Sequence, residues 1–217
     1  VPYLYKRSNY VNAVQWAVGL EVALLAKDLW RVFLTTDHPN GGPFYEYPRV
    51  IAWLMSKKAR EETFNEVHQY ARERSTLSGI DRELDLYEIA ILTRAGTAKV
   101  LGLKDKGHLG VGADADVAIY DLNPRELSSR EPGKIVKSFS KAVYTIKEGE
   151  IVVKDGEVVK ETMGKTIWVD PQVDEDAMKS FLEEIKPEFE KYYSIRFSNY
   201  PVSDRYLPRQ ERIIVGG

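Results

Sequence analysis

Apolar residues recur at three- and four-residue intervals through much of the first hundred positions, which predicts helices. The segment 10–27 is apolar on more than one face, so we expect a well-buried helix there. Pro48 suits the first turn of a second helix that runs to about Glu62. We also expect residues 64–74 to be helical. The first hundred residues are therefore expected to be mostly helical.

Two shorter segments add a predicted strand and a predicted helix start to this pattern. The run Arg31–Thr36 is β-branched and aromatic with little alternation, which predicts a parallel strand covered on both faces. It stops at the turn residues 37–43. Residues 85–88 have the spacing of a capping box before an apolar run. We expect the helix that begins there to break near Gly96, with a short helix following.

From Gly107 onward, short alternating strands replace the helical spacing. The dipeptide Asp155-Gly156 predicts a two-residue hairpin turn. A helix is expected after Pro171, to about Tyr193, with a bend at Pro187. The expected strands are Asp116–Asp121, Ala142–Lys147, Glu150–Lys154, Glu157–Lys160, Lys165–Val169 and Arg212–Val215.

This order of elements predicts an α/β chain with a boundary near residue 105. We distinguish a mostly helical part at 1–105, a strand-rich part at 106–170, and a terminal helix and tail at 171–217. Because hairpins pair locally, we expect the ordered core to centre on the later hairpins and the helix of residues 85–101. We expect residues 1–43 to be irregular or to pair with a second copy.

Composition narrows the possible partners. The 217 residues include 31 basic and 33 acidic ones, so no charge excess favours nucleic acid or an anionic membrane. The absence of cysteine excludes disulfides and thiolate-bound metals from this chain and fits a reducing cytoplasm. The apolar stretch 13–26 is too short to span a bilayer. Since the sequence starts at Val1, we expect it to be part of a longer protein.

Candidate chemistry is concentrated at one loop. The histidines His38, His68 and His108 are isolated, which argues against a three-histidine metal site; we expect His68 at the surface and His108 in a structural turn. Asp37 follows the predicted strand, where a barrel carboxylate binds metal or acts as a base. Alternatively, Asp37 is an ordinary Asx-type turn residue with an exposed His38 beside it. Spacing alone leaves both interpretations open.

Several segments of the sequence resemble one protein family. The neighbourhood of Asp37 looks like the A-type subunit of formylmethanofuran dehydrogenase, and the later segments resemble the amidohydrolase superfamily more generally. The segments close to the A-type subunit are Thr35–Pro43, Gln15–Glu21 and Ile51–Ser56; the more general ones are Thr93–Leu103, Gly107–Asp121 and Val143–Gly156.

The resemblance implies a fold and a metal site. Residues 1–105 would be the C-terminal end of a (β/α) metal-dependent hydrolase barrel, and 106–170 part of the composite β-sandwich. The family holds a dinuclear divalent metal, expected to be zinc, and Asp37 matches its aspartate ligand and catalytic base. The remaining ligands would lie upstream, so this chain alone is expected to be inactive and without bound metal. His38 and Asn40 are weaker candidates for substrate or supporting contacts.

The resemblance also implies a reaction and partners. The complete subunit would interconvert N-formylmethanofuran with formate plus methanofuran, within methanogenic one-carbon metabolism in the archaeal cytoplasm. Its partners would be a molybdenum or tungsten subunit, iron–sulfur subunits and methanofuran, with no nucleic acid or membrane. Two alternatives remain: another cyclic-amide amidohydrolase, of the hydantoinase or dihydroorotase type, and a non-catalytic scaffold subunit.

Overall fold

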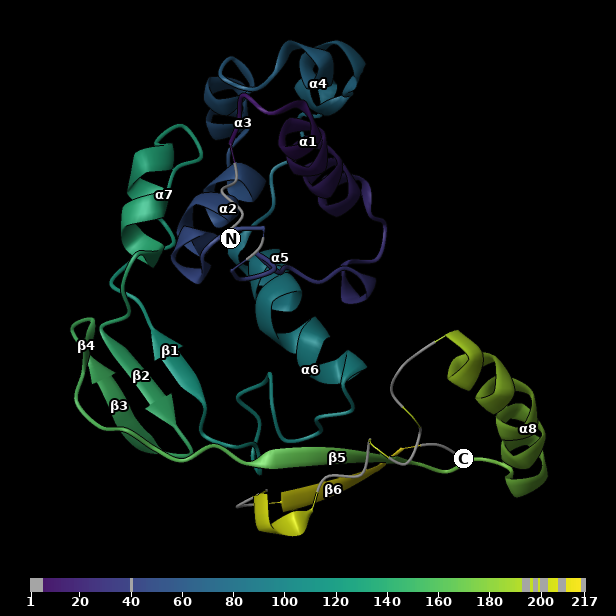
Figure 1. Cartoon of the computed structure of the whole chain (residues 1–217). Helices are drawn as coiled ribbons and strands as arrows, with labels where there is room; N and C mark the ends of the chain where they lie inside the picture. Colours follow the sequence, from purple (N-terminus) through teal and green to yellow (C-terminus); the bar gives the residue numbers. More distant parts are fainter. Residues whose placement is uncertain are drawn as a thin grey trace. The chain divides into compact units, whose positions relative to one another are not determined.

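The computed structural model of the chain describes residues 6–39, 41–192, 196, 199, 203–206 and 210–215. It has mixed α/β structure and separates into two compact units, residues 1–161 and 162–217 (Figure 1). The boundaries near residues 105 and 170 that the sequence suggests stay predictions.

The first part of the larger unit is helical, as its apolar spacing predicts. Asn9 begins the first helix by accepting hydrogen bonds from the N–H groups of Val11 and Asn12. Ser56 has an extended backbone and caps the following helix, so the single helix predicted from Pro48 to Glu62 is in fact two. The helices are α1 (Tyr10–Leu25), α2 (Tyr47–Met55), α3 (Lys57–Phe64), α4 (Gln69–Arg74), α5 (Leu86–Ala90) and α6 (Gly96–Val100), with 3-10 turns η1 (Leu29–Arg31), η2 (Phe44–Glu46) and η3 (Leu77–Gly79).

The hydrophobic core lies among these helices, and this corrects two expectations. Residues of α1 such as Ala13, Leu20 and Leu24 are buried in it, so residues 1–43 are not simply irregular. We expected the core to centre on the hairpins and on the helix of residues 85–101. No described strand residue belongs to it, but the helix contributes Ile89, Ile91 and Leu92. The strands β1–β4 are short, and most of them begin or end in a charged residue, while α1 and α2 are longer and apolar on wide faces.

Two arginines, one buried and one half-buried, connect the helices through backbone carbonyls. Arg60 is 2% exposed and donates to the backbone carbonyls of Trp53, Ile80 and Arg82. Arg82 donates to the carbonyls of Leu24 and Ala26 at the end of α1, and it pairs with Glu88 at 2.8 Å. Glu88 in turn completes the predicted capping box with Asp85. A planar guanidinium with five donors can serve several acceptors in this way.

The predicted strand Arg31–Thr36 is not present. Residues 32–37 form no strand, and Leu34 N–H donates instead to the carbonyl of Leu92 at 3.2 Å. Leu92 lies in η4 (Ile91–Ala95), a π-helical turn in which Gly96 N–H bonds the carbonyl of Ile91, five residues back. Gly96 therefore does not break the helix, contrary to expectation; α5, η4 and α6 follow one another without interruption.

The later part of the larger unit is an antiparallel sheet of order β1-β2-β3-β4 (Figure 1). The predicted Asp155-Gly156 turn is confirmed: both residues have positive φ, as a two-residue turn of this type requires. Glu148-Gly149 repeats this geometry between β2 and β3. The strands are β1 (Val117–Ile119), β2 (Tyr144–Lys147), β3 (Glu150–Lys154) and β4 (Glu157–Val158).

One helix of the larger unit is not predicted by the sequence pattern. Helix α7 (Pro132–Phe139) packs against α2 and buries Ile135. Its signal is weak, because Pro132-Gly133 has the composition of a turn. In the structure Pro132 opens the helix, and the spacing of Ile135 and Phe139 continues it.

Gly107 marks a close approach that yields a testable prediction. Its φ is +78°, and an added Cβ would lie 2.6 Å from the Cβ of Ala98. We expect Gly107→Ala to lower the free energy of unfolding by about 3 kcal/mol, through backbone strain and overpacking. Chemical denaturation measures this loss. Gly112→Ala is the matched control, because Gly112 also has positive φ but open space around it; equal losses would contradict the packing argument.

The smaller unit contains β5 (Thr166–Pro171), α8 (Glu175–Tyr192) and β6 (Gln210–Val215), with a 3-10 turn η6 (Asp204–Tyr206). Strands β5 and β6 pair in parallel, and Lys165 pairs with Glu211 at 2.6 Å beside them. Pro187 lies inside α8, as predicted. Across the described residues, no helix is both long and apolar enough to cross a membrane.

Candidate functional site

The loop after Thr36 holds Asp37 in a defined but unusual backbone conformation. Asp37 has φ +49°, its N–H donates to Thr35 Oγ1 at 3.1 Å, and its carbonyl accepts from Gly41 N–H at 3.0 Å. An added Cβ at Gly41 would lie 2.8 Å from the carbonyl oxygen of Thr36, so only glycine fits this fold-back. The loop therefore presents Asp37 with little backbone freedom.

The Asp37 carboxylate itself faces solvent. Asp37 is exposed, and within the described part of the chain no hydrogen bond or ion pair involves its carboxylate. The Asx-turn interpretation requires the carboxylate to accept a local backbone N–H, and no such bond is present there. Asp37 therefore combines an uncommon backbone conformation with an unengaged carboxylate, which makes it a candidate functional residue.

His38 connects Asp37 to the following aromatic residues. Its Nδ1 accepts from the N–H of Phe44 at 3.3 Å, and the two rings meet edge to face, 5.2 Å apart. A neutral His38 therefore carries its proton on Nε2. His38 remains exposed, so Nε2 is open to a ligand. Asn40, the third candidate, lies outside the described residues.

Phe44 and Tyr45 extend the site beyond the residues that sequence reasoning singled out. Phe44 is 64% exposed and Tyr45 69%, and their rings lie 6.1 Å apart. Both belong to η2, which leads directly into α2, a helix anchored in the core. Most of the surface of both rings is thus exposed to solvent. The sequence signal was present, because Pro43-Phe44-Tyr45 directly follows the candidate loop.

Asp37 fits a divalent metal as a single ligand. Carboxylate oxygens bind such ions well, but zinc sites use three or four protein ligands. Within the described residues no three His, Cys, Asp or Glu side chains come together in a group that could hold a metal. The other two histidines bind neighbouring backbone: His68 Nδ1 accepts from Tyr70 N–H, and His108 Nδ1 accepts from Gly110 N–H. The predicted structural turn at His108 is confirmed.

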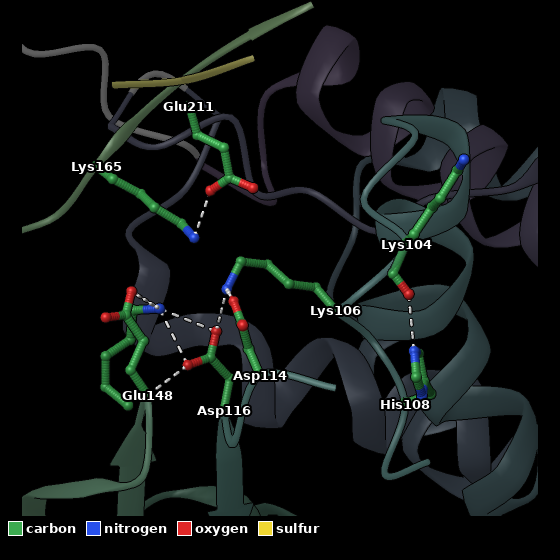
Figure 2. A network of polar contacts seen from close by, with 9 residues as sticks. Lys104, Lys106, His108, Asp114, Asp116, Glu148, Lys165 and Glu211 are labelled. Carbon is green, nitrogen blue, oxygen red and sulfur yellow. Dashed lines mark hydrogen bonds and ion pairs between the residues drawn. The ribbon is translucent and has the colours of Figure 1, made fainter. Parts of the chain in front are cut away.

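A second charged cluster lies where the chain enters the sheet (Figure 2). Lys106 Nζ contacts Asp114 at 2.6 Å and Asp116 at 2.7 Å. Lys147 Nζ contacts Asp116 at 2.9 Å, and the Glu148 N–H donates to Asp116 as well. These contacts tie the loop before β1 to the turn between β2 and β3. Each of these charges has an opposite partner, as is typical of a structural ion-pair network.

The cluster shifts the pKa values of its members in opposite directions. Burial acts to raise the pKa of Asp116, but hydrogen bonds from Lys106, the Glu148 N–H and Lys147 outweigh it and hold the pKa well below its usual range. Burial likewise acts to lower the pKa of Lys106, and its bonds to Asp114 and Asp116 raise it instead. The ionised forms are therefore the ones that stabilise the fold.

We expect Asp116→Asn to destabilise the fold by about 2 kcal/mol at pH 7, because Lys106 loses one of its two carboxylates and Lys147 loses its contact at 2.9 Å. The pKa of Asp116 is depressed in the folded state, so its contribution is fully present above the unfolded value of about 3.9. It is lost as pH falls below that value. Urea titrations at pH 7 and pH 3 should show a smaller difference from wild type at pH 3. Asp121→Asn, at an exposed site, is the control; a pH-independent difference would contradict the account.

Comparison with known proteins identifies the protein family. Residues 4–153 match the model of a family described as "Amidohydrolase family". The chain belongs to the amidohydrolase family.

Individual relatives show which members of the family this chain resembles. Protein FwdA of Methanocaldococcus jannaschii is 56% identical over 208 residues, which is 95% of this chain and 36% of that protein. The A-type subunit of the formyltransferase/hydrolase complex Fhc of Methylorubrum extorquens is 44% identical over 187 residues, 85% of this chain and 32% of that protein. The resemblance to the A-type subunit of formylmethanofuran dehydrogenase, predicted from the neighbourhood of Asp37, is confirmed.

A solved structure agrees with these relatives. The crystal structure of the FhcABCD formyltransferase/hydrolase complex from Methylorubrum extorquens with methylofuran superposes with a TM-score of 0.76 at 38% identity. The match covers all of this chain and 38% of the matched one. An allantoinase of Desulfitobacterium hafniense is 31% identical over 106 residues, 42% of this chain and 24% of that enzyme. The chain spans about a third of the length of FwdA and of its Fhc counterpart.

Proposed function

We propose that this chain forms part of an amidohydrolase subunit that interconverts N-formylmethanofuran with formate plus methanofuran. The carrying observation is the Asp37 loop, which presents an unengaged carboxylate at positive φ. The similarity to FwdA and to its Fhc counterpart over most of the chain supports the assignment to this class of complex. The similar solved structure is a complex, FhcABCD, which supports a multi-subunit setting.

In this proposal, the helices up to α6 are the end of a (β/α) barrel, and the sheet β1–β4 is part of the composite sandwich. The segment 32–37 would take the place of a barrel strand and complete its pairing with strands contributed by the rest of the protein. The β-branched and aromatic character of this segment supports that role.

Asp37 would hold a dinuclear divalent metal, proposed to be zinc, together with ligands from the rest of the protein. When bound, such a metal pair lowers the pKa of a water molecule and polarises the formyl oxygen. Asp37 accepts the proton of the attacking water and delivers it to the leaving amine nitrogen. The close approach of Gly41 to Thr36 and the bond from Gly41 N–H to the Asp37 carbonyl would fix the backbone from which the carboxylate makes both transfers.

Partner subunits with molybdenum or tungsten and with iron–sulfur clusters would supply formate by reducing carbon dioxide. This chain has no cysteine, so it supplies no thiolate ligand to such a centre. The cytoplasmic, methanogenic setting of the complex is part of the same proposal. The isolated chain would be inactive, since Asp37 provides one metal ligand.

The test is substrate choice by the assembled complex. We expect formate release from N-formylmethanofuran and no ring opening of allantoin or hydantoin. The allantoinase similarity makes the ureide reaction the competing possibility. Ring opening without formate release would replace the proposal by that alternative. A complex that does neither but assembles normally would point to a scaffold role.

A further inference from the structure

The turn between β3 and β4 places a carboxyl group beside a backbone nitrogen that no hydrogen bond occupies. Asp155 and Gly156 form this turn with φ +50° and +83°, and both are exposed. Over the described ranges of the chain, no hydrogen bond involves the Gly156 N–H, and no hydrogen bond or ion pair involves the Asp155 carboxylate. The two groups are therefore free to react with each other.

The turn between β2 and β3 has the same backbone angles but lacks this reactive pair. Glu148 and Gly149 also have φ +50° and +83°. The Gly149 N–H, however, donates to the carbonyl of Ala115 at 3.1 Å. The aspartate side chain is also one carbon shorter than that of glutamate, so its Cγ closes a five-membered ring with the next backbone nitrogen. Asp155-Gly156 thus differs from its counterpart in both the free N–H and the ring that it forms.

We propose that Asp155 is a site of spontaneous isomerisation to isoaspartate through a cyclic imide. The Gly156 nitrogen attacks Cγ of the protonated Asp155 side chain. The N–Cγ bond forms, and the Cγ hydroxyl leaves with the amide proton as one water molecule. A water molecule then adds to the main-chain carbonyl carbon of Asp155 and breaks the bond from that carbon to the Gly156 nitrogen. The chain now continues through Cγ, and the former main-chain carbonyl is a free carboxylate.

The surroundings of the turn favour ring formation. Glycine has no Cβ that would shield its nitrogen. Strand β4 has two residues and lies at the edge of the sheet, where it pairs through Val153 with Val158 and Lys154 with Glu157. So short an edge pairing opens at little cost in free energy compared with global unfolding. The turn can therefore adopt the geometry of the imide while the rest of the fold stays intact. Water is the co-reactant, and no oxidation or reduction occurs.

The product is expected to disturb the hairpin. Isoaspartate lengthens the main chain by one carbon atom, and the register of a hairpin is set by its turn. The Asp155 N–H now bonds the carbonyl of Val143 at 2.7 Å, and the Val159 N–H bonds the carbonyl of Val152 at 2.9 Å. We expect both amides to exchange hydrogen faster in the isomerised chain. This modification does not depend on the proposed function.

The test ages the complete subunit at neutral pH and locates isoaspartate by peptide mass spectrometry with electron-based fragmentation. We expect isoaspartate to accumulate with time at position 155. It should be far less abundant at Asp121, which is also exposed but precedes the bulky Leu122. Asp155→Glu should abolish the signal at this position. Aged protein without isoaspartate at position 155 would overturn the proposal.

The matched control is Glu148→Asp, which gives the turn between β2 and β3 the same side chain as its counterpart. Its φ angles are the same, but its glycine N–H is bonded to the Ala115 carbonyl. We expect isoaspartate to form more slowly at position 148 of this variant than at position 155. Equal rates would show that the free N–H of Gly156 does not select the site, which would overturn the structural basis of the inference.

Discussion

Replacing Asp37 by asparagine is expected to lower formyl hydrolysis by the complete enzyme about 100- to 10,000-fold, the usual contribution of a positioned acid–base group. Asparagine keeps the size of the side chain and tolerates the positive φ of this position. It cannot accept the proton of the attacking water. Because Asp37 is exposed, the free energy of unfolding should change by about 1 kcal/mol or less. Formate release and chemical denaturation measure the two effects.

The control for Asp37 is Asp155→Asn. Asp155 is also an exposed aspartate at φ +50°, but it occupies the hairpin turn between β3 and β4. Any general effect of the substitution in this backbone conformation should appear in both variants. Activity close to wild type in Asp37→Asn would eliminate the carboxylate from the mechanism.

Arg60→Met is expected to cost about 3 kcal/mol of stability. Arg60 is 2% exposed, and three backbone carbonyls accept from its guanidinium: those of Trp53, Ile80 and Arg82. Methionine fills a similar volume but leaves these acceptors without their donors. Burial lowers the pKa of Arg60, and nearby Glu83, Glu61 and Asp81 act in the opposite direction. Urea titration at neutral pH measures the loss.

Arg60→Lys should recover only part of that loss, because an ammonium cannot reproduce the planar fork that reaches all three carbonyls. Arg72→Met, at an exposed position on α4, is the control and should change stability by about 0.5 kcal/mol or less. If the Arg60 and Arg72 variants were equally stable, the three carbonyl contacts would not be what holds α2, α3 and the Ile80–Arg82 segment together.

Local signals in the sequence were sufficient for some elements and not for others. The capping box at Asp85 and the turn at Asp155-Gly156 depend on neighbouring residues alone, and both are confirmed. The strand at Arg31–Thr36 depends on a partner, and its backbone meets the Leu92 carbonyl instead. Apolar content indicated burial of this segment but could not show what it pairs with.

For the candidate site too, the sequence predicted some features and not others. Position in the sequence pointed to Asp37 and His38, because turn residues follow an apolar run. The bond from Phe44 N–H to His38 and the close approach of Gly41 to Thr36 are three-dimensional facts with no periodic signature. The buried role of Arg60 was hidden for another reason: in a stretch as charged as 57–62 a solvent-facing position is the usual expectation.

The π turn at Ile91–Ala95 sets the direction in which the side chains of α6 point relative to those of α5. Each residue of an α-helix advances the side-chain direction by about 100°. A π turn inserts one extra residue, so deleting one residue from Ile91–Ala95 would turn α6 by roughly that angle relative to α5. Ala98 would then rotate away from Gly107, and Arg94 from the hydroxyl of Tyr120 that it now reaches at 3.2 Å. The one extra residue therefore sets the rotation of the following helix about its axis, and with it the contacts to Gly107 and Tyr120.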